Sequence, residues 1–333
     1  MRTRNRIQLL AGALAVALSA LPAAGIAQSP STAPAASVNP ADAACAGKRL
    51  GFMIWNTSVP FYTNLIKGAE DQAAALGMDI DIRSGNGELT GQVATVQQFI
   101  TEGFDMILVA PSDPQGIVPV IQEANAANIP VLAVNTKVGD GGTVVTYVGV
   151  DDFVFGQNQG ELLKLALPDG GTVAYINGHL GVSAQIDRRA GLMDALGGDA
   201  KYQFVEEQTA EWDNAKALAL VQDWLNKYPA GELDAIVDQG PEGATAAKYV
   251  MDSGRTEIKF IVGDFPADVK AGVADGSIFG TTDQDPYPQG VNGVQVACWY
   301  LSGQTDKIVA PNMYLDLPII TIENVDQYPA AWG

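Results

Sequence analysis

The chain has 333 residues, of which 47% are hydrophobic and 17% are charged, so it can bury a large core and fits two domains of ordinary size. It contains 19 basic and 38 acidic residues, for a formal net charge of −19. So acidic a surface repels phosphate backbones and anionic lipids, which argues against nucleic-acid and membrane-surface partners.

The N-terminus has the layout of a secretory signal peptide. Three arginines precede an apolar run from Leu9 to Leu21, and small residues follow as far as Ala27. We therefore predict a signal peptide over residues 1–27 and export of the mature protein. Residues 28–44 are small and Pro-rich without periodicity, which predicts a disordered leader. No other apolar run reaches the roughly 18 residues that a membrane span requires.

The two cysteines, Cys45 and Cys298, leave two interpretations open. An even pair in an oxidising compartment favours a disulfide, but the sequence alone does not show whether the two side chains meet. Two separate buried thiols are the alternative. Cys45 lies too far beyond the apolar run to be a lipid anchor attached at signal cleavage.

From Arg49 onward, apolar runs rich in β-formers alternate with helical patterns. The predicted strands cover residues 50–55, 78–83, 105–110, 129–135, 145–150, 172–177, 202–207, 234–239, 258–264 and 278–284. The predicted helices cover residues 61–76, 91–102, 114–127, 153–166, 183–196, 213–227, 241–253 and 287–301. Continuous apolar strands separated by amphipathic helices indicate parallel sheets covered on both faces. The predicted fold class is therefore α/β, with two doubly wound units.

Aromatic and polar side chains follow the predicted strands, where ligands bind in open parallel sheets. In the first half of the chain these residues are Trp55, Phe61, Tyr62, Asn135 and Thr136. In the second half they are Arg188, Trp212, Gln239, Asp264 and Gln284. Aromatic faces can stack on the C–H face of a sugar, while amides, a carboxylate and a guanidinium can pair with its hydroxyls. The set predicts a site for a small neutral ligand with several hydroxyl groups.

Six runs, in this order, resemble the successive motifs of the ribose-binding-protein family, the periplasmic sugar-binding components of ABC importers. They are VPFYTNLIKGAEDQAAALGMDIDI, ANAANIPVLAVNT, VGVDDFVFGQNQG, GVSAQIDRRAG, IKFIVGDF and GTTDQDPYPQG. The resemblance implies a periplasmic-binding-protein type I fold with two parallel-sheet lobes and a three-stranded hinge, crossed near 148–151, 281–285 and 311–316. It places the N-terminal lobe at 45–148 and 285–311, and the C-terminal lobe at 152–281 and 315–330.

The resemblance also implies a function. The protein would be a periplasmic monomer that closes around a small sugar or polyol, without a cofactor, and delivers it to the permease of an ABC transporter. Phe61 and Tyr62 would stack on one face of the ligand and Trp212 on the other. The polar partners would be Arg188, Asp264 and Gln284, with Trp55 and Gln239 bordering the pocket.

Three departures from the family pattern leave the identity of the ligand open. Asn135-Thr136 stands where relatives carry Asp-Arg, and Val59 stands where they carry Asn. Gly240-Pro241 follows Gln239, where relatives have a further Asn. Because three hydrogen-bonding groups are lost or neutralised, ribose does not carry over as the ligand. A polyol, a deoxysugar and a small alcohol-like metabolite all fit this pattern.

Other functions find less support in the sequence. The single histidine, His179, lies in the Gly-rich loop NGHLG, which predicts a solvated loop residue and not a catalytic base. The loop SGNGELTG only approaches a dinucleotide-binding fingerprint, and the chain has no Gly-x-Ser-x-Gly elbow and no His or Cys spacing for zinc. An exported enzyme is therefore disfavoured. Presentation of the ligand to a membrane receptor, a sensory role, stays open beside transport.

Overall fold

The computed structural model describes residues 42–333 and contains two six-stranded sheets. The predicted signal peptide lies outside the described residues, as does the predicted leader up to residue 41. Within residues 42–333, no helix is both long enough and apolar enough to cross a membrane.

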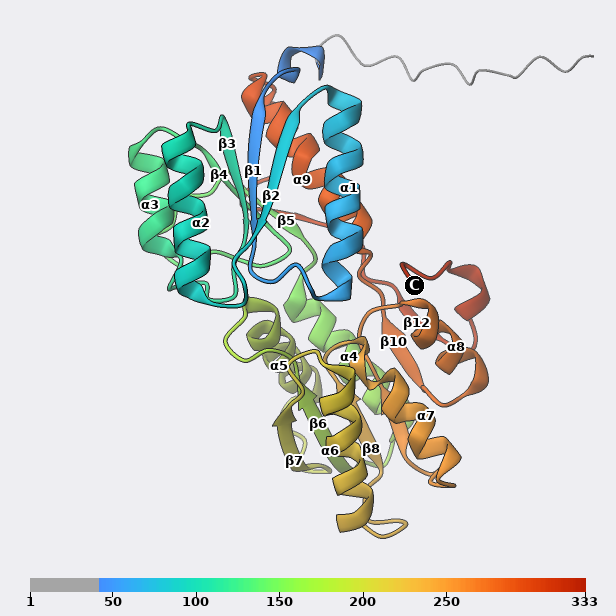
Figure 1. The fold of residues 1–333 in the computed structure, drawn as a ribbon. Helices are drawn as coiled ribbons and strands as arrows, with labels where there is room; N and C mark the ends of the chain where they lie inside the picture. Colours follow the sequence, from blue (N-terminus) through green and yellow to red (C-terminus); the bar gives the residue numbers. More distant parts are fainter. Residues whose placement is uncertain (1–41) are drawn as a thin grey trace, which may run out of the picture. The chain divides into compact units, whose positions relative to one another are not determined.

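The first sheet has the strand order β11-β5-β4-β3-β1-β2, and all its neighbouring strands are parallel (Figure 1). Its strands are β1 (Arg49–Ile54), β2 (Asp79–Ser84), β3 (Met106–Ala110), β4 (Val131–Val134), β5 (Tyr147–Gly149) and β11 (Asn312–Tyr314). Helices α1 (Pro60–Leu76) and α9 (Pro286–Leu301) cover one face. Helices α2 (Leu89–Glu102) and α3 (Val118–Ala126) cover the other. We call this sheet and its four helices the N-terminal lobe.

Strand β1 shows why the sheet is covered on both faces. Leu50, Phe52 and Ile54 pack into the apolar cluster with α1 and α9, whereas Met53 packs into the cluster with α2 and α3. Alternate side chains of a strand point to opposite faces, so a continuous apolar run needs a helical layer on each side. Gly51 makes room for the second layer, since a Cβ there would lie 2.6 Å from the Phe99 ring.

The second sheet has the order β12-β10-β9-β8-β6-β7 and is parallel except for the β10–β12 pair. Its strands are β6 (Gly171–Asn177), β7 (Tyr202–Thr209), β8 (Ala235–Asp238), β9 (Lys259–Ile261), β10 (Gly280–Thr282) and β12 (Ile319–Thr321). Helices α4 (Asp152–Ala166) and α5 (Ser183–Leu196) pack on one face. Helices α6 (Asn214–Lys227), α7 (Ala244–Asp252) and α8 (Ala267–Asp275) pack on the other. We call this sheet and its five helices the C-terminal lobe.

The chain passes between the two sheets three times, from β5 to α4, from β10 to α9, and from β11 to β12. The predicted fold class, two parallel-sheet α/β lobes, is therefore confirmed. In detail, the helix predicted from residue 114 begins at Val118, and α8, β11 and β12 were not predicted as separate elements. The predicted lobe boundaries stay a prediction.

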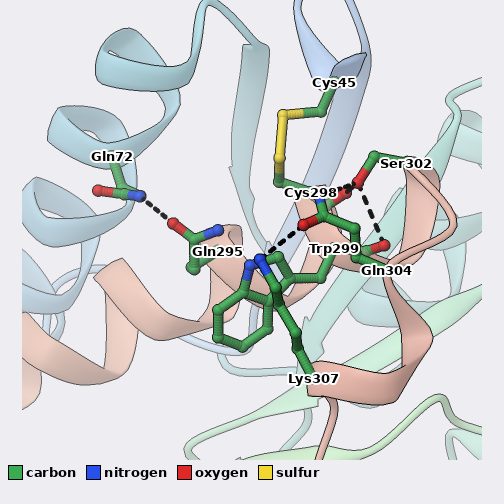
Figure 2. The surroundings of a disulfide bond; sticks show 8 residues. All are labelled: Cys45, Gln72, Gln295, Cys298, Trp299, Ser302, Gln304 and Lys307. Carbon is green, nitrogen blue, oxygen red and sulfur yellow. Dashed lines mark hydrogen bonds between the residues drawn. A yellow bond between two sulfur atoms is a disulfide. The ribbon is translucent and has the colours of Figure 1, made fainter. Parts of the chain in front are cut away.

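A disulfide joins Cys45, in the short 3-10 helix Asp42–Cys45, to Cys298 in α9 (Figure 2). The structure thus decides between the two interpretations of the cysteines in favour of a bond. Beside it, Gln72 of α1 donates a hydrogen bond of 2.7 Å to Gln295 of α9. The segment before β1 and the last helix of the N-terminal lobe, which lie far apart in the sequence, are therefore covalently joined.

Candidate functional site

A cavity of about 390 Å³ lies where the carboxyl ends of both sheets meet. Its volume is within the range of small-molecule sites, roughly 300–1,000 Å³. Eight of the ten predicted site residues line it: Phe61, Tyr62, Asn135, Thr136, Arg188, Trp212, Asp264 and Gln284. Trp55 and Gln239 do not line the cavity and instead support residues that do.

The N-terminal lobe contributes two aromatic rings from the first turn of α1. Pro60 occupies the start of the helix, where its missing N–H leaves no bond unmade, and Phe61 and Tyr62 follow. Their rings meet edge to face at 5.6 Å. Tyr62 accepts a hydrogen bond of 2.8 Å from the indole N–H of Trp55, and its hydroxyl donates to Asn135 at 2.9 Å. Burial raises the pKa of Tyr62 well above its usual value, so the hydroxyl stays protonated.

A chain of side-chain amides continues from Asn135 towards the C-terminal lobe. The Asn135 amide donates to Gln289 at 3.0 Å, and Gln289 donates to Gln284 at 3.4 Å. Gln284 in turn donates to an Asp264 carboxylate oxygen at 2.9 Å. The Thr136 hydroxyl donates to the backbone oxygen of Pro111 at 2.8 Å. These bonds link Tyr62 of α1 to Asp264 and fix the orientations of the amides between them.

The C-terminal lobe contributes a buried guanidinium, that of Arg188 in α5. Its Nε donates to Asp152 at 2.9 Å, and its Nη1 donates to the backbone oxygen of Gln239 at 2.8 Å. The guanidinium also lies 3.7 Å above the Phe155 ring and 4.0 Å from an Asp264 oxygen. Gln239 thus supports Arg188 from behind through its main chain. Its own side chain bonds Tyr175 and the backbone at Gly178.

Burial and charge act in opposite directions on these ionisable groups. Burial raises the pKa of Asp264 to about 6, although Arg188 and the Gln284 amide partly offset it. Burial likewise raises the pKa of Asp152, against the attraction of Arg188. For Arg188, burial disfavours the cation, but Asp152 and Asp264 outweigh burial and raise the pKa. At neutral pH Arg188 is therefore a donor and Asp264 is mostly an acceptor, which suits a ligand hydroxyl on each.

Three cavity residues have left-handed backbone conformations: Asn135 with φ 67°, Trp212 with φ 58° and Asp264 with φ 60°. Asn and Asp tolerate this region, but a bulky residue such as Trp rarely adopts it. The Trp212 ring packs so closely on Gly178 that a Cβ there would lie 2.2 Å from an indole carbon. The surrounding fold therefore holds Trp212 in a strained conformation at the cavity wall.

Two aromatic contacts at the site were not predicted. Trp332, 42 residues beyond the last recognised motif, lines the cavity and lies 5.6 Å from the Phe61 ring. His179, predicted to be a solvated loop residue, is half-buried and stacks on Trp55 at 5.0 Å. The only sequence signal for Trp332 was a pair of aromatic residues in YPAAW, at the end of the sequence. Within residues 42–333, no cluster of three or more His, Cys, Asp or Glu is placed to hold a metal ion.

Comparison with curated proteins finds relatives over most of the chain. The ribose import binding protein of Escherichia coli is 26% identical over 262 residues, which cover 78% of this chain and 87% of the relative. The xylitol-binding protein of Mycolicibacterium smegmatis is 26% identical over 280 residues, which cover 84% of this chain and 78% of the relative.

Solved structures similar to this chain also include solute-binding proteins of ABC transporters. An ABC transporter solute-binding protein from Mycobacterium smegmatis with bound glycerol is 28% identical, with a TM-score of 0.77 over 85% of this chain and 96% of that one. A solute-binding protein from Bacillus halodurans with bound myo-inositol is 25% identical, with a TM-score of 0.77 over 85% and 97%. The family model for the periplasmic binding protein domain matches residues 50–305. The chain therefore belongs to the periplasmic binding protein family, with its two-lobed type I fold.

Proposed function

We propose that this protein captures a small sugar or polyol between its lobes in the periplasm and delivers it to the membrane permease of an ABC transporter. The observation that carries the proposal is the cavity itself, in which rings of the N-terminal lobe face Arg188 and Asp264 of the C-terminal lobe. The relatives support it, because their names and bound molecules are ribose, xylitol, glycerol and myo-inositol.

In this proposal each part of the ligand has its own partner. Phe61 and Tyr62 stack on one apolar face of the ligand, and Trp212 stacks on the other. Asp264 accepts from one hydroxyl, while Arg188, Asn135 and Gln284 pair with others. Trp55 and Gln239 act as positioning residues, because they hold Tyr62 and Arg188 without reaching the cavity.

Ligand binding favours the closed arrangement of the lobes, because only there does the ligand touch both sets of partners. In the structure the lobes also contact each other directly. Lys137 pairs with Asp187 at 2.6 Å, its backbone N–H donates to Ser183 at 2.9 Å, and Trp55 stacks on His179. We infer that this closed surface is what the permease recognises.

The proposal includes five finer points. Residues 1–27 direct export and are removed, the mature protein acts as a monomer, and the ligand leaves chemically unchanged. The lobes would comprise 45–148 with 285–311 and 152–281 with 315–330, and the three crossings would act as the hinge.

A thermal-shift screen of the mature protein against pentoses, hexoses, polyols and small alcohols tests the proposal. A ligand that binds only the folded protein stabilises it by RT ln(1 + [L]/Kd), about 2.7 kcal/mol at a hundred times Kd. We expect one class to raise the melting temperature and to compact the protein in solution scattering. An unchanged melting temperature and unchanged scattering with every class would refute the proposal. Uptake of the labelled ligand by cells with and without the permease separates transport from sensing.

A further inference from the structure

The Trp212 indole contacts two glycines at the carboxyl ends of neighbouring strands. Trp212 follows β7, and the sheet order places β6 next to β7 and β8 next to β6. Gly178 is the first residue after β6, and Gly240 lies in the loop after β8. A Cβ on Gly178 would lie 2.2 Å from an indole carbon, and a Cβ on Gly240 would lie 2.7 Å from another. The ring thus extends from the end of β7 over β6 to the β8 loop.

The main chain does not require glycine at either position. Gly240 has φ −132° and ψ −168°, and Gly178 also has no left-handed conformation. Since only a positive φ favours glycine, the backbone of alanine fits both positions. A side chain is excluded by the space that the indole occupies. We call Gly178 and Gly240 the glycine platform, because their lack of side chains makes room for Trp212.

Gln239 holds the two parts of the glycine platform together. Its side-chain oxygen accepts a hydrogen bond of 2.8 Å from the Gly178 N–H, and Gly240 is the next residue in the chain. The Gly240 oxygen in turn accepts a bond of 3.0 Å from the Gly263 N–H. The platform is therefore fixed by bonds in which the Trp212 side chain takes no part.

The segment that carries the indole is strained. Glu211 and Trp212 are consecutive residues with φ of 54° and 58°, a region that non-glycine residues rarely adopt. The Asp213 N–H donates to the Ala210 oxygen at 2.9 Å, and the Asp213 side chain caps α6 by accepting from the Lys216 N–H at 2.9 Å. Such strain persists only where the surrounding structure fixes it, and it clusters at ligand sites. Here it holds an indole at the cavity wall.

We propose that Gly178 and Gly240 are positioning residues, which set how far the Trp212 ring enters the cavity and thereby the width left for the ligand. This inference rests on the proposed function. Trp212 lines the cavity and neither glycine does, so the platform lies behind the ring. A side chain on the platform would push the ring towards the ligand by about 1 Å or more, because carbon atoms in contact lie about 3.5–4.0 Å apart.

The proposal also explains one departure from the family pattern. Relatives have a further Asn where Gly240 follows Gln239 in this chain. A side chain at this position would meet the Trp212 ring. The hydrogen-bonding group that is lost there is therefore exchanged for an aromatic face.

A double-mutant cycle measured by isothermal titration calorimetry tests the platform. The probe is the compound of the thermal-shift screen that binds the wild type most tightly, beginning with ribose, xylitol, glycerol and myo-inositol. Gly178→Ala should weaken its binding about tenfold or more, because the displaced ring occupies part of the ligand's space. In a Trp212→Ala background, the same change should alter Kd less than about twofold, because the ring is absent.

Two further variants separate this role from a general effect on folding. Gly171→Ala adds a Cβ 2.7 Å from an Asp234 oxygen at the other end of β6, outside the cavity. It should leave Kd unchanged even where it lowers the melting temperature. If Gly178→Ala does not fold, Gly240→Ala replaces it in the same cycle. A Cβ on Gly240 would also meet a Glu242 oxygen at 2.3 Å, so Gly178→Ala is the cleaner variant.

The outcomes distinguish this inference from the proposed function. Wild-type affinity in Gly178→Ala overturns the positioning role and leaves the proposed function standing. Equal weakening by Gly178→Ala with and without the Trp212 ring does the same, as does wild-type affinity in Trp212→Ala alone. If no sugar or polyol of the whole screen binds the wild type, the proposed function fails and this inference fails with it.

Discussion

The N-terminal lobe presents aromatic rings and amides to the cavity, whereas the C-terminal lobe presents a guanidinium and a carboxylate. The supports of Tyr62 and Arg188 lie within their own lobes, whereas the amide chain through Gln289 and Gln284 links Asn135 of one lobe to Asp264 of the other. Tyr62 is held by Trp55 and Asn135, which both belong to the N-terminal lobe. Arg188 is held by Asp152 and the Gln239 main chain, which both belong to the C-terminal lobe.

Under the proposed function, this difference would let each half of the site be ready before the lobes close. A buried charge needs a partner from the moment the lobe folds, because an unpaired ion in the interior costs several kcal/mol. The C-terminal lobe supplies that partner itself, through Asp152. Rings and amides are neutral and need no charged partner. In the proposed mechanism, the N-terminal lobe can therefore approach the ligand after the C-terminal lobe has bound it, without leaving a buried charge unpaired.

The largest expected effect concerns the disulfide that stabilises the N-terminal lobe. Replacing both Cys45 and Cys298 by Ala removes a crosslink with a sequence separation of 253 residues. In the chain-entropy model this costs about 5 kcal/mol of unfolding free energy. Calorimetry should show a lower melting temperature for the double variant, and a reductant should lower the wild-type value but leave the variant unchanged. An unchanged melting temperature in the double variant contradicts this.

The C-terminal lobe should depend in the same way on its buried ion pair. Arg188 and Asp152 are 3% and 1% exposed, so Arg188→Ala leaves an uncompensated buried carboxylate and should cost about 3–5 kcal/mol of stability. The adjacent Arg189 is a matched control, because its pair with Glu207 is 23% and 39% exposed. Arg189→Ala should cost about 1 kcal/mol or less. Equal losses in urea unfolding would show that Arg188 has no special role.

A substitution of Asp264 tests the charged half of the site and leaves the buried Arg188–Asp152 pair in place. A hydrogen bond to a charged group is worth roughly 1.5–3 kcal/mol, so Asp264→Ala should weaken ligand binding about tenfold or more. Asp275 lies on the same lobe outside the cavity and accepts a bond from the Ser277 main chain. Asp275→Ala should leave the affinity unchanged. Wild-type affinity in Asp264→Ala would remove this carboxylate from the site.

The buried carboxyls of the C-terminal lobe and of the crossing after β10 also predict an unusual pH dependence. Burial raises the pKa of Glu242 to about 7, that of Asp283 to about 7 and that of Asp264 to about 6. Their folded-state pKa values exceed the unfolded ones, so the folded protein binds more protons between about pH 4 and pH 7. The stability that they contribute is present at low pH and is lost as the pH rises through the folded values.

The ligand-free protein should therefore melt at a higher temperature at pH 5.5 than at pH 7.5. Glu242→Gln should make this profile shallower, because one of the three buried groups no longer titrates. Glu161→Gln changes an exposed carboxylate on α4 and should leave the slope as it is in the wild type. A melting temperature that rises steadily from pH 5.5 to pH 7.5 in the wild type contradicts the prediction.

The long apolar strands and the residues at their ends were predictable from the sequence, because continuous burial and parallel topology leave a clear pattern. The nine-residue α8 and the three-residue β11 and β12 were not, since such short segments are selected by their tertiary partners. The supporting roles of Trp55 and Gln239 were also hidden, because a residue just after a strand can point into a cavity or behind it. Trp332 was missed because the docking of a chain end depends on main-chain bonds that leave no residue pattern.

The smallest expected effect concerns the contact between the two halves. Lys137 and Asp187 pair across the lobes and are 28% and 30% exposed, so the pair is worth about 1 kcal/mol or less. Burial disfavours the Lys137 ammonium, but Asp187 outweighs it and raises the pKa of the lysine. Lys137→Ala should therefore raise the apparent Kd by about twofold to fivefold, because it removes a contact of the closed state alone.

High salt should reproduce part of this loss in the wild type and none of it in the Lys137→Ala variant, since partly exposed pairs are screened. Lys164→Ala removes an exposed pair with Glu161 inside α4 and should leave the affinity unchanged. If Lys137→Ala instead lowered the melting temperature of the ligand-free protein with no change in Kd, the pair would already be formed without ligand. It would then stabilise the association of the two lobes and not their closure by the ligand.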